Sequence, residues 1–130
     1  MKDFNYEITI KADREEVYAA LTTPFQIELW SGYPAEMIAE AGTEFSLWGG
    51  DICGKNLSFM PNKSVVQEWY FGETEEKSIV EILLKVDTVS ANKTKIRLKH
   101  TNIPDEAFEE ICEGWREYYI GAIQNFLEIY

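Results

Sequence analysis

The last part of the chain carries the pattern that most constrains the fold. From Phe108 onward, apolar side chains recur at steps of three and four residues, which places them on one face of an α-helix. Pro104 marks the start, and acidic residues crowd the first turns, where the helix dipole favours negative charge. We therefore expect one long C-terminal helix, and its apolar stripe consists of Ile111, Cys112, Trp115, Tyr119, Ala122, Ile123 and Phe126.

Two glycines interrupt this pattern. Gly114 and Gly121 lie inside the expected helix, at a cost of about 1 kcal/mol each relative to alanine. Such glycines usually allow another element to approach closely, and we expect the same here.

Upstream of the helix, apolar and polar residues alternate with the period of half-buried β-strands. In the clearest case Thr94, Ile96, Leu98 and His100 alternate with lysine and arginine, so one face is basic and the other is buried. Strands are expected at residues 4–10, 43–48, 52–60, 65–71, 80–86 and 94–100. Turns are expected at 49–51, 61–63 and 91–93, with an acidic, solvated loop at 72–77.

Two short helices are expected after the first strand. Asp13 is a suitable N-cap for the first of them, and Glu16, three residues later, fits a capping box. Pro24 suits the first turn of the second, which is expected to run to Trp30. This order predicts a single α+β domain over residues 1–130. In it, a curved antiparallel sheet of about six or seven strands wraps around the long C-terminal helix.

The formal net charge of −11 limits the partners of the chain. Nucleic acids and anionic membranes are disfavoured, because both attract clustered lysine and arginine, whereas a basic protein surface remains compatible. No apolar run approaches the roughly 20 residues of a membrane span, and the acidic start does not fit a signal peptide, so a cytoplasmic location is expected. Cys53 and Cys112 have no metal-ligand spacing, and we expect both to be buried, reduced thiols.

His100 is the single histidine of the sequence and falls on the inward face at the end of its expected strand. Two interpretations stay open: a polar group at a cavity mouth or general base, and a partly buried histidine bonded to backbone. No serine or cysteine nucleophile can be paired with it from the sequence. We therefore expect no catalytic residues, no metal site and no cofactor.

An ordered set of short motifs, spread over nearly the whole chain, resembles a known family. The most specific is Ile103-Pro104 followed by Gly114-Trp115-Arg116-Glu117-Tyr118-Tyr119-Ile120. The others are Ala12 with Val17, Ala20-Leu21-Thr22, Trp30, Gly42-Thr43-Glu44-Phe45, Gly50, Gly54, Pro61, Val65-Val66-Gln67-Glu68-Trp69 and Thr94-Lys95-Ile96. These motifs are similar to those of the START-like superfamily, the helix-grip domains. Within it they resemble the C-terminal domain of the activator of heat shock protein 90 ATPase.

The resemblance implies a helix-grip fold, which often leaves a pocket for an apolar ligand between sheet and helix. The alternative is that the aromatic rings fill this space as an ordinary core. If a pocket exists, His100 and Tyr119 would supply its polarity. The expected lining is Phe45, Leu47, Trp69, Ile82, Ile96, His100, Ile111, Trp115 and Tyr119.

Three functions are compatible with these features. The first is a non-enzymatic domain that binds a small apolar ligand or a protein partner. The second is a co-chaperone that stimulates the heat shock protein 90 ATPase. The eukaryotic activator has an additional N-terminal domain for its grip on the chaperone, and nothing in this sequence corresponds to it. The third is a cofactor-independent cyclase or hydrolase that uses the helix-grip cavity.

Overall fold

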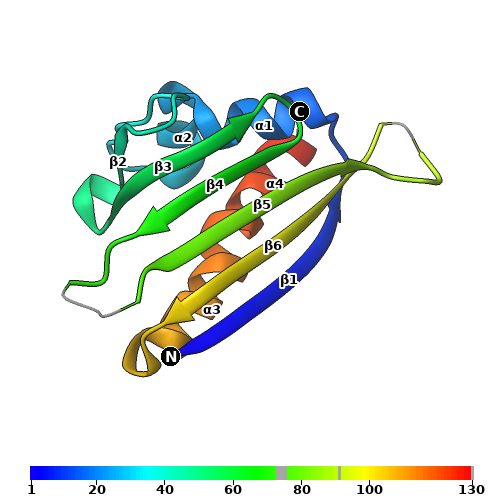
Figure 1. The fold of residues 1–130 in the computed structure, drawn as a ribbon. Coiled ribbons are helices and arrows are strands. Elements are labelled where there is room, and N and C mark those ends of the chain that lie inside the picture. Colours follow the sequence, from blue (N-terminus) through cyan, green and yellow to red (C-terminus); the bar gives the residue numbers. More distant parts are fainter. Residues whose placement is uncertain (73–75, 91, 130) are drawn as a thin grey trace.

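The computed structural model describes residues 1–72, 76–90 and 92–129. Its curved six-stranded antiparallel sheet has the order β1-β6-β5-β4-β3-β2, and the C-terminal helical segment runs along one face of the sheet (Figure 1). The strands are β1 (Lys2–Ile10), β2 (Glu44–Leu47), β3 (Ile52–Met60), β4 (Ser64–Trp69), β5 (Ser78–Val86) and β6 (Thr94–Ile103). The longer helices are α1 (Arg14–Thr22), α2 (Pro24–Ser31), α3 (Phe108–Glu113) and α4 (Ile120–Glu128). The predicted helix-grip α+β fold is confirmed.

The alternating strands are confirmed where the sheet is most regular. β6 pairs with β1 on one side and with β5 on the other, so that Ile96 lies opposite both Ile8 and Leu84. Ile96, Leu98 and Leu84 face the helix and are buried. On the opposite face Glu7 forms ion pairs with Lys95 and Arg97, at 2.9 and 3.0 Å. Period-two alternation therefore separated core from solvent correctly.

The other half of the sheet is less regular. A register shift between Asn56 and Ser58 interrupts the pairing of β3 with β4. β4 ends at Trp69, although the alternation predicted a strand as far as Phe71. Phe71 leaves the sheet and is half-buried, and its ring lies 6.0 Å from that of His100.

The two short helices α1 and α2 pack beside the C-terminal helix. Asp13 occupies the N-cap position of α1, but its side chain makes no capping hydrogen bond, so the predicted capping box is wrong. Burial holds these helices in place instead: Val17 and Ile27 are fully enclosed. The Trp30 indole N–H also donates to the carbonyl of Ala20, at 2.8 Å, and thereby joins α2 to α1.

The C-terminal segment is not one continuous α-helix. A short 3-10 turn, Asp105–Ala107, precedes α3, and a π-helical turn, Gly114–Tyr119, separates α3 from α4. The π turn inserts one residue and rotates the buried face, so that Ile120 is fully buried although the expected stripe omitted it.

The π turn also explains Gly121. A Cβ atom at this position would collide with the carbonyl oxygen of Arg116, which belongs to the same helical segment. Around Gly114, by contrast, a Cβ atom would meet no other atom. The expectation that both glycines admit a second structural element is therefore wrong: Gly121 lets the helix widen, and Gly114 borders open space.

The two cysteines differ in their surroundings. Both are free thiols, and Cys112 is buried as predicted. Cys53 is only half-buried, beside the edge strand β2, so the prediction of a second buried thiol is wrong.

Parts of two predicted loops lie outside the described residues, namely positions 73–75 of the acidic loop and position 91 of the turn before β6. Among the described helices, none combines the length and the apolar character needed to cross a bilayer.

Candidate functional site

A cavity of about 850 Å³ lies between the C-terminal helical segment and the end of the sheet where β4 stops. Four parts of the chain line it: Tyr33 after α2, the end of β4 with Phe71, the connection between β2 and β3, and the run from Ala107 to Tyr119. Figure 1 shows these strand ends and α3 at the same end of the molecule. The lining consists of Tyr33, Trp48, Asp51, Ile52, Trp69, Phe71, Ala107, Glu110, Ile111, Glu113, Gly114, Trp115, Tyr118 and Tyr119.

Stacked aromatic rings form the inner wall of this cavity. Trp69, from β4, stacks on Trp115, from the π turn, with their ring centroids 4.8 Å apart. Tyr119 lies 4.4 Å from Trp115 and 5.4 Å from Trp48. Aromatic pairs at such separations add to the stability gained by burial, so the wall is a packed part of the domain.

The Tyr119 hydroxyl is a polar group within this aromatic wall. The side chain is 2% exposed and makes no hydrogen bond with the described residues. Every fully enclosed side-chain nitrogen or oxygen in the described part of the chain has a partner, so this hydroxyl is not fully enclosed, and Tyr119 is one of the residues that line the cavity. Burial raises the pKa of Tyr119, which keeps the hydroxyl protonated and able both to donate and to accept a hydrogen bond.

His100 lies behind the wall, fully buried, and is held by side chains. The Trp115 indole N–H donates to its Nδ1 at 3.0 Å, and its Nε2 lies 2.8 Å from Ser78 Oγ. Because Nδ1 accepts, a neutral ring must carry its proton on Nε2 and donate it to Ser78. Ser78 then donates to the carbonyl of Thr101, at 3.1 Å. Burial lowers the pKa of His100 to about 4, against a weaker opposing effect of Asp3.

This arrangement corrects both interpretations of His100. It is neither at a cavity mouth nor bonded to backbone, because Ser78 and Trp115 occupy its two ring nitrogens. A histidine that activates a serine accepts the hydroxyl proton on the nitrogen facing it. Here that nitrogen is the donor, so the Ser78–His100 pair is not arranged as a nucleophile and its base. The third function considered above, a cyclase or hydrolase, would therefore need catalytic groups other than the Ser78–His100 pair.

A second buried polar chain holds Trp69. Its indole N–H donates to Gln67 Oε1 at 3.1 Å, and Gln67 Nε2 donates to Asn56 Oδ1 at 2.9 Å. The Asn56 amide donates in turn to the carbonyl of Ile38 and to Thr43 Oγ1, both at 3.1 Å. The indoles of Trp69 and Trp115 are thus fixed from behind by satisfied polar chains, which restricts their rotation.

The structure brings together only part of the predicted ligand site. Trp69, Ile111, Trp115 and Tyr119 line the cavity. The remaining predicted residues are buried in the core outside the lining. They are Phe45, Leu47, Ile82, Ile96 and His100. Two lining residues that the predicted site missed are Trp48, in the turn after β2, and Phe71, which lies beyond the end of β4 although the alternation continues to it.

The mouth of the cavity is acidic. Asp51, Glu110 and Glu113 line it and are exposed, whereas no lysine, arginine or histidine among the described residues lines it. Within the described ranges no group of three or more His, Cys, Asp or Glu side chains could hold a metal ion.

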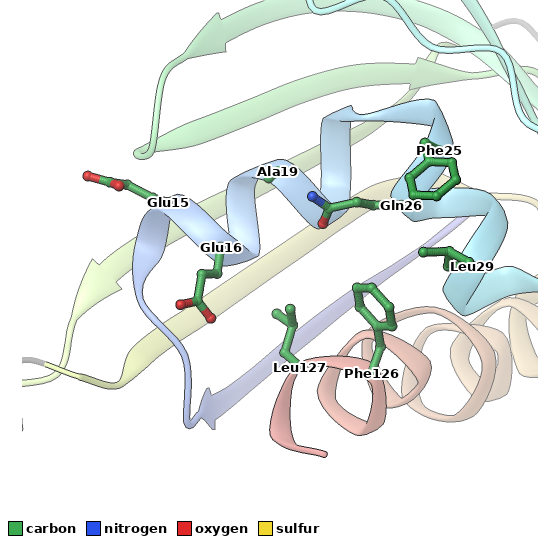
Figure 2. A pocket seen from close by; sticks show the side chains of 8 residues that line it. All are labelled: Glu15, Glu16, Ala19, Phe25, Gln26, Leu29, Phe126 and Leu127. Carbon is green, nitrogen blue, oxygen red and sulfur yellow. The ribbon is translucent and has the colours of Figure 1, made fainter. Parts of the chain in front are cut away.

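A second hollow, of about 520 Å³, lies on the surface between α1, α2 and α4. Figure 2 shows Phe25 and Leu29 of α2 beside Phe126 and Leu127 of α4, with Glu15 and Glu16 of α1 at the rim. We call this the helical groove. Phe25 is 71% exposed and Leu29 is 56% exposed, so together they add apolar surface to this groove.

Comparison with known proteins agrees with this architecture. The model of the family described as "Activator of Hsp90 ATPase homolog 1-like protein" matches residues 11–128. The human activator of 90 kDa heat shock protein ATPase homolog 1 is 26% identical over 117 residues, which cover 90% of this chain and 34% of that protein. The chain therefore spans about a third of the length of this curated relative.

Solved structures give the same result. A crystal structure of an HSP90 activator from Plasmodium falciparum is 25% identical, with a TM-score of 0.88, and the match covers 98% of this chain and 97% of that one. The solution structure of the Aha1 dimer from Colwellia psychrerythraea is also 25% identical, with a TM-score of 0.82 and coverage of 99% and 98%. The resemblance drawn from the motifs is confirmed, and the chain belongs to the family of Activator of Hsp90 ATPase homolog 1-like proteins.

Proposed function

We propose that this chain is a non-enzymatic binding domain that takes up a small, largely apolar molecule between its π turn and the end of β4. The observation that carries the proposal is the cavity of about 850 Å³, whose wall is aromatic and whose buried Tyr119 hydroxyl has no partner among the described residues. Cavities of this size with few polar groups are typical of small-molecule sites. The polar chains behind Trp69 and Trp115 support it, because a site with a fixed wall loses less entropy on binding.

The test is a titration with a panel of lipids and aromatic metabolites, followed by amide chemical shifts and melting temperature. We expect at least one compound to shift the amides of Trp69, Trp115 and Tyr119 and to raise the melting temperature, since a ligand that binds only the folded state stabilises it. A panel that leaves every amide and the melting temperature unchanged contradicts the proposal.

A variant that fills the cavity with a side chain, together with a matched control, tests whether a ligand binds in this cavity. A Cβ atom at Gly114 would meet no other atom, and its backbone is helical, so Gly114→Leu should occupy the cavity without strain. We expect this variant to fold and to lose at least about tenfold in affinity for any compound that binds. Gln124→Leu, which adds a leucine on α4 away from the cavity, should bind like the unmodified protein.

A second candidate is co-chaperone action on a heat shock protein 90-type chaperone. Two observations favour it: relatives in the family carry the name of activators of this ATPase, and the helical groove exposes Phe25 and Leu29. Contiguous exposed apolar side chains rimmed by polar groups are typical of protein contacts. An ATPase assay with the chaperone from the same organism is the test, and we expect stimulation.

Variants of the helical groove separate this function from ligand binding. Phe25→Ser with Leu29→Ser should reduce stimulation at least about fivefold. Replacing these exposed side chains should change the stability of the domain little, but it removes apolar contacts with the chaperone. Leu83→Ser with Val89→Ser removes exposed apolar groups elsewhere and should have no effect. No stimulation at a large molar excess of unmodified protein contradicts this candidate function.

A further inference from the structure

The charge at the cavity mouth is one-sided. Glu110 and Glu113 are three residues apart on α3, so their side chains project from neighbouring positions on one helix face. Asp51 lies across from them, in the connection that leads into β3. None of these carboxylates forms an ion pair with the described residues, and no basic side chain lines the cavity to neutralise them.

The aromatic wall behind this acidic mouth also favours a cation. Indole rings carry negative charge on their faces, and they attract cations more strongly than phenyl or phenol rings do. Trp48, Trp69 and Trp115 all line the cavity. Trp69 and Trp115 are stacked on each other and buried, so the half-buried Trp48 is the most accessible of the three indoles. The Tyr119 hydroxyl adds an oxygen that can accept a hydrogen bond from an N–H group.

We infer that the cavity binds organic ammonium compounds, with an aromatic or apolar body against the aromatic wall and a protonated amine directed towards the acidic mouth. This rests on the proposed ligand-binding function and narrows the chemical class of the ligand. Fatty acids and other carboxylates fit poorly, because no cationic group lines the cavity to receive them. A neutral apolar molecule would leave the carboxylates at the mouth without a partner of opposite charge.

Three indoles that differ mainly in charge test the inference: tryptamine, tryptophol and indole-3-propionate. Amide chemical shifts of the full chain, followed during titration, report both affinity and location. We expect tryptamine to shift the amides that line the cavity and to bind about tenfold more tightly than tryptophol, with indole-3-propionate weakest. If tryptophol binds as tightly as tryptamine in the cavity, the preference for a cation is overturned while the proposed ligand-binding function stands.

Two matched double variants locate the charge effect. Glu110→Gln with Glu113→Gln should weaken tryptamine binding about fivefold and leave tryptophol unchanged, since each exposed charge contributes modestly. Glu106→Gln with Glu109→Gln makes the same change in net charge on the same segment, outside the lining, and should affect neither compound. Equal effects of the two double variants on tryptamine overturn the inference. The inference is also overturned if none of the three indoles shifts an amide of the cavity. The titration with lipids and aromatic metabolites tests the proposed ligand-binding function separately.

Discussion

Trp115→Ala should lower the free energy of unfolding by about 3–5 kcal/mol, the usual range for emptying a large aromatic core site. The side chain is 1% exposed, stacks on Trp69, packs against Tyr119, and donates its indole N–H to His100. Small domains have only about 5–15 kcal/mol of stability in total, so this single change removes a large share. Urea unfolding followed by circular dichroism measures it, and a loss below about 1 kcal/mol would show that Trp115 is not a core residue.

Trp115→Phe is the informative companion. It keeps most of the ring but removes the N–H, which leaves Nδ1 of His100 as a buried acceptor without its donor. We expect a loss of about 1–3 kcal/mol, the usual cost of such an unsatisfied group. If the two variants lose the same amount, the hydrogen bond rather than the ring carries the stability of this site.

The sheet was predictable because its signal is local. Residues two apart in β5 and β6 share a face, and their polarity shows which face is buried. The failures occur where a strand stops for reasons beyond its own sequence. Phe71 continues the apolar alternation of β4, yet it leaves the sheet and packs near His100, which lies 29 positions further along the chain.

The π turn and the buried polar chains were not predictable from spacing alone. Steps of three and four residues describe an α-helix, and one inserted residue changes the phase after Tyr119 without leaving a gap in the pattern. Gly121 was the available signal, because only glycine accommodates the carbonyl of Arg116 there. The pairing of Ser78 with His100 depends on strand register, which the sequence does not state.

The candidate site was only partly predictable for a related reason. An inward-facing strand position can lie either under the helix or beyond its edge, and alternation does not distinguish these. Ile82 and Ile96 lie under the helix and are enclosed, whereas Trp69 lies at the end of its strand and faces the cavity. The residues shared by the family motif and the cavity, Trp115 and Tyr119, were found because they belong to the helix itself.

The buried histidine should make the domain sensitive to mild acid. His100 has an ordinary pKa of 6.5, which burial lowers to about 4 in the folded chain. Between these values the unfolded chain binds a proton that the folded chain excludes. The free energy of unfolding should therefore fall by about 3 kcal/mol as the pH decreases from about 6.5 to 4, and this contribution should be fully present above pH 6.5.

His100→Gln isolates this effect from other acid-sensitive groups. Glutamine has an acceptor for the Trp115 N–H and a donor for Ser78, but it takes up no proton in this range. Glu7, whose pKa is lowered by hydrogen bonds from Lys95 and Arg97, is present in both proteins and cancels in their difference. Urea unfolding of both proteins at several pH values between 7 and 4 measures this effect. As the pH decreases, the free energy of unfolding of the unmodified protein should fall by about 3 kcal/mol relative to that of His100→Gln. If the free energies of unfolding of the two proteins change in parallel with pH, the folded protein accommodates a charged imidazole at position 100. The hydrogen bonds of His100 with Trp115 and Ser78 would then rearrange when His100 is protonated.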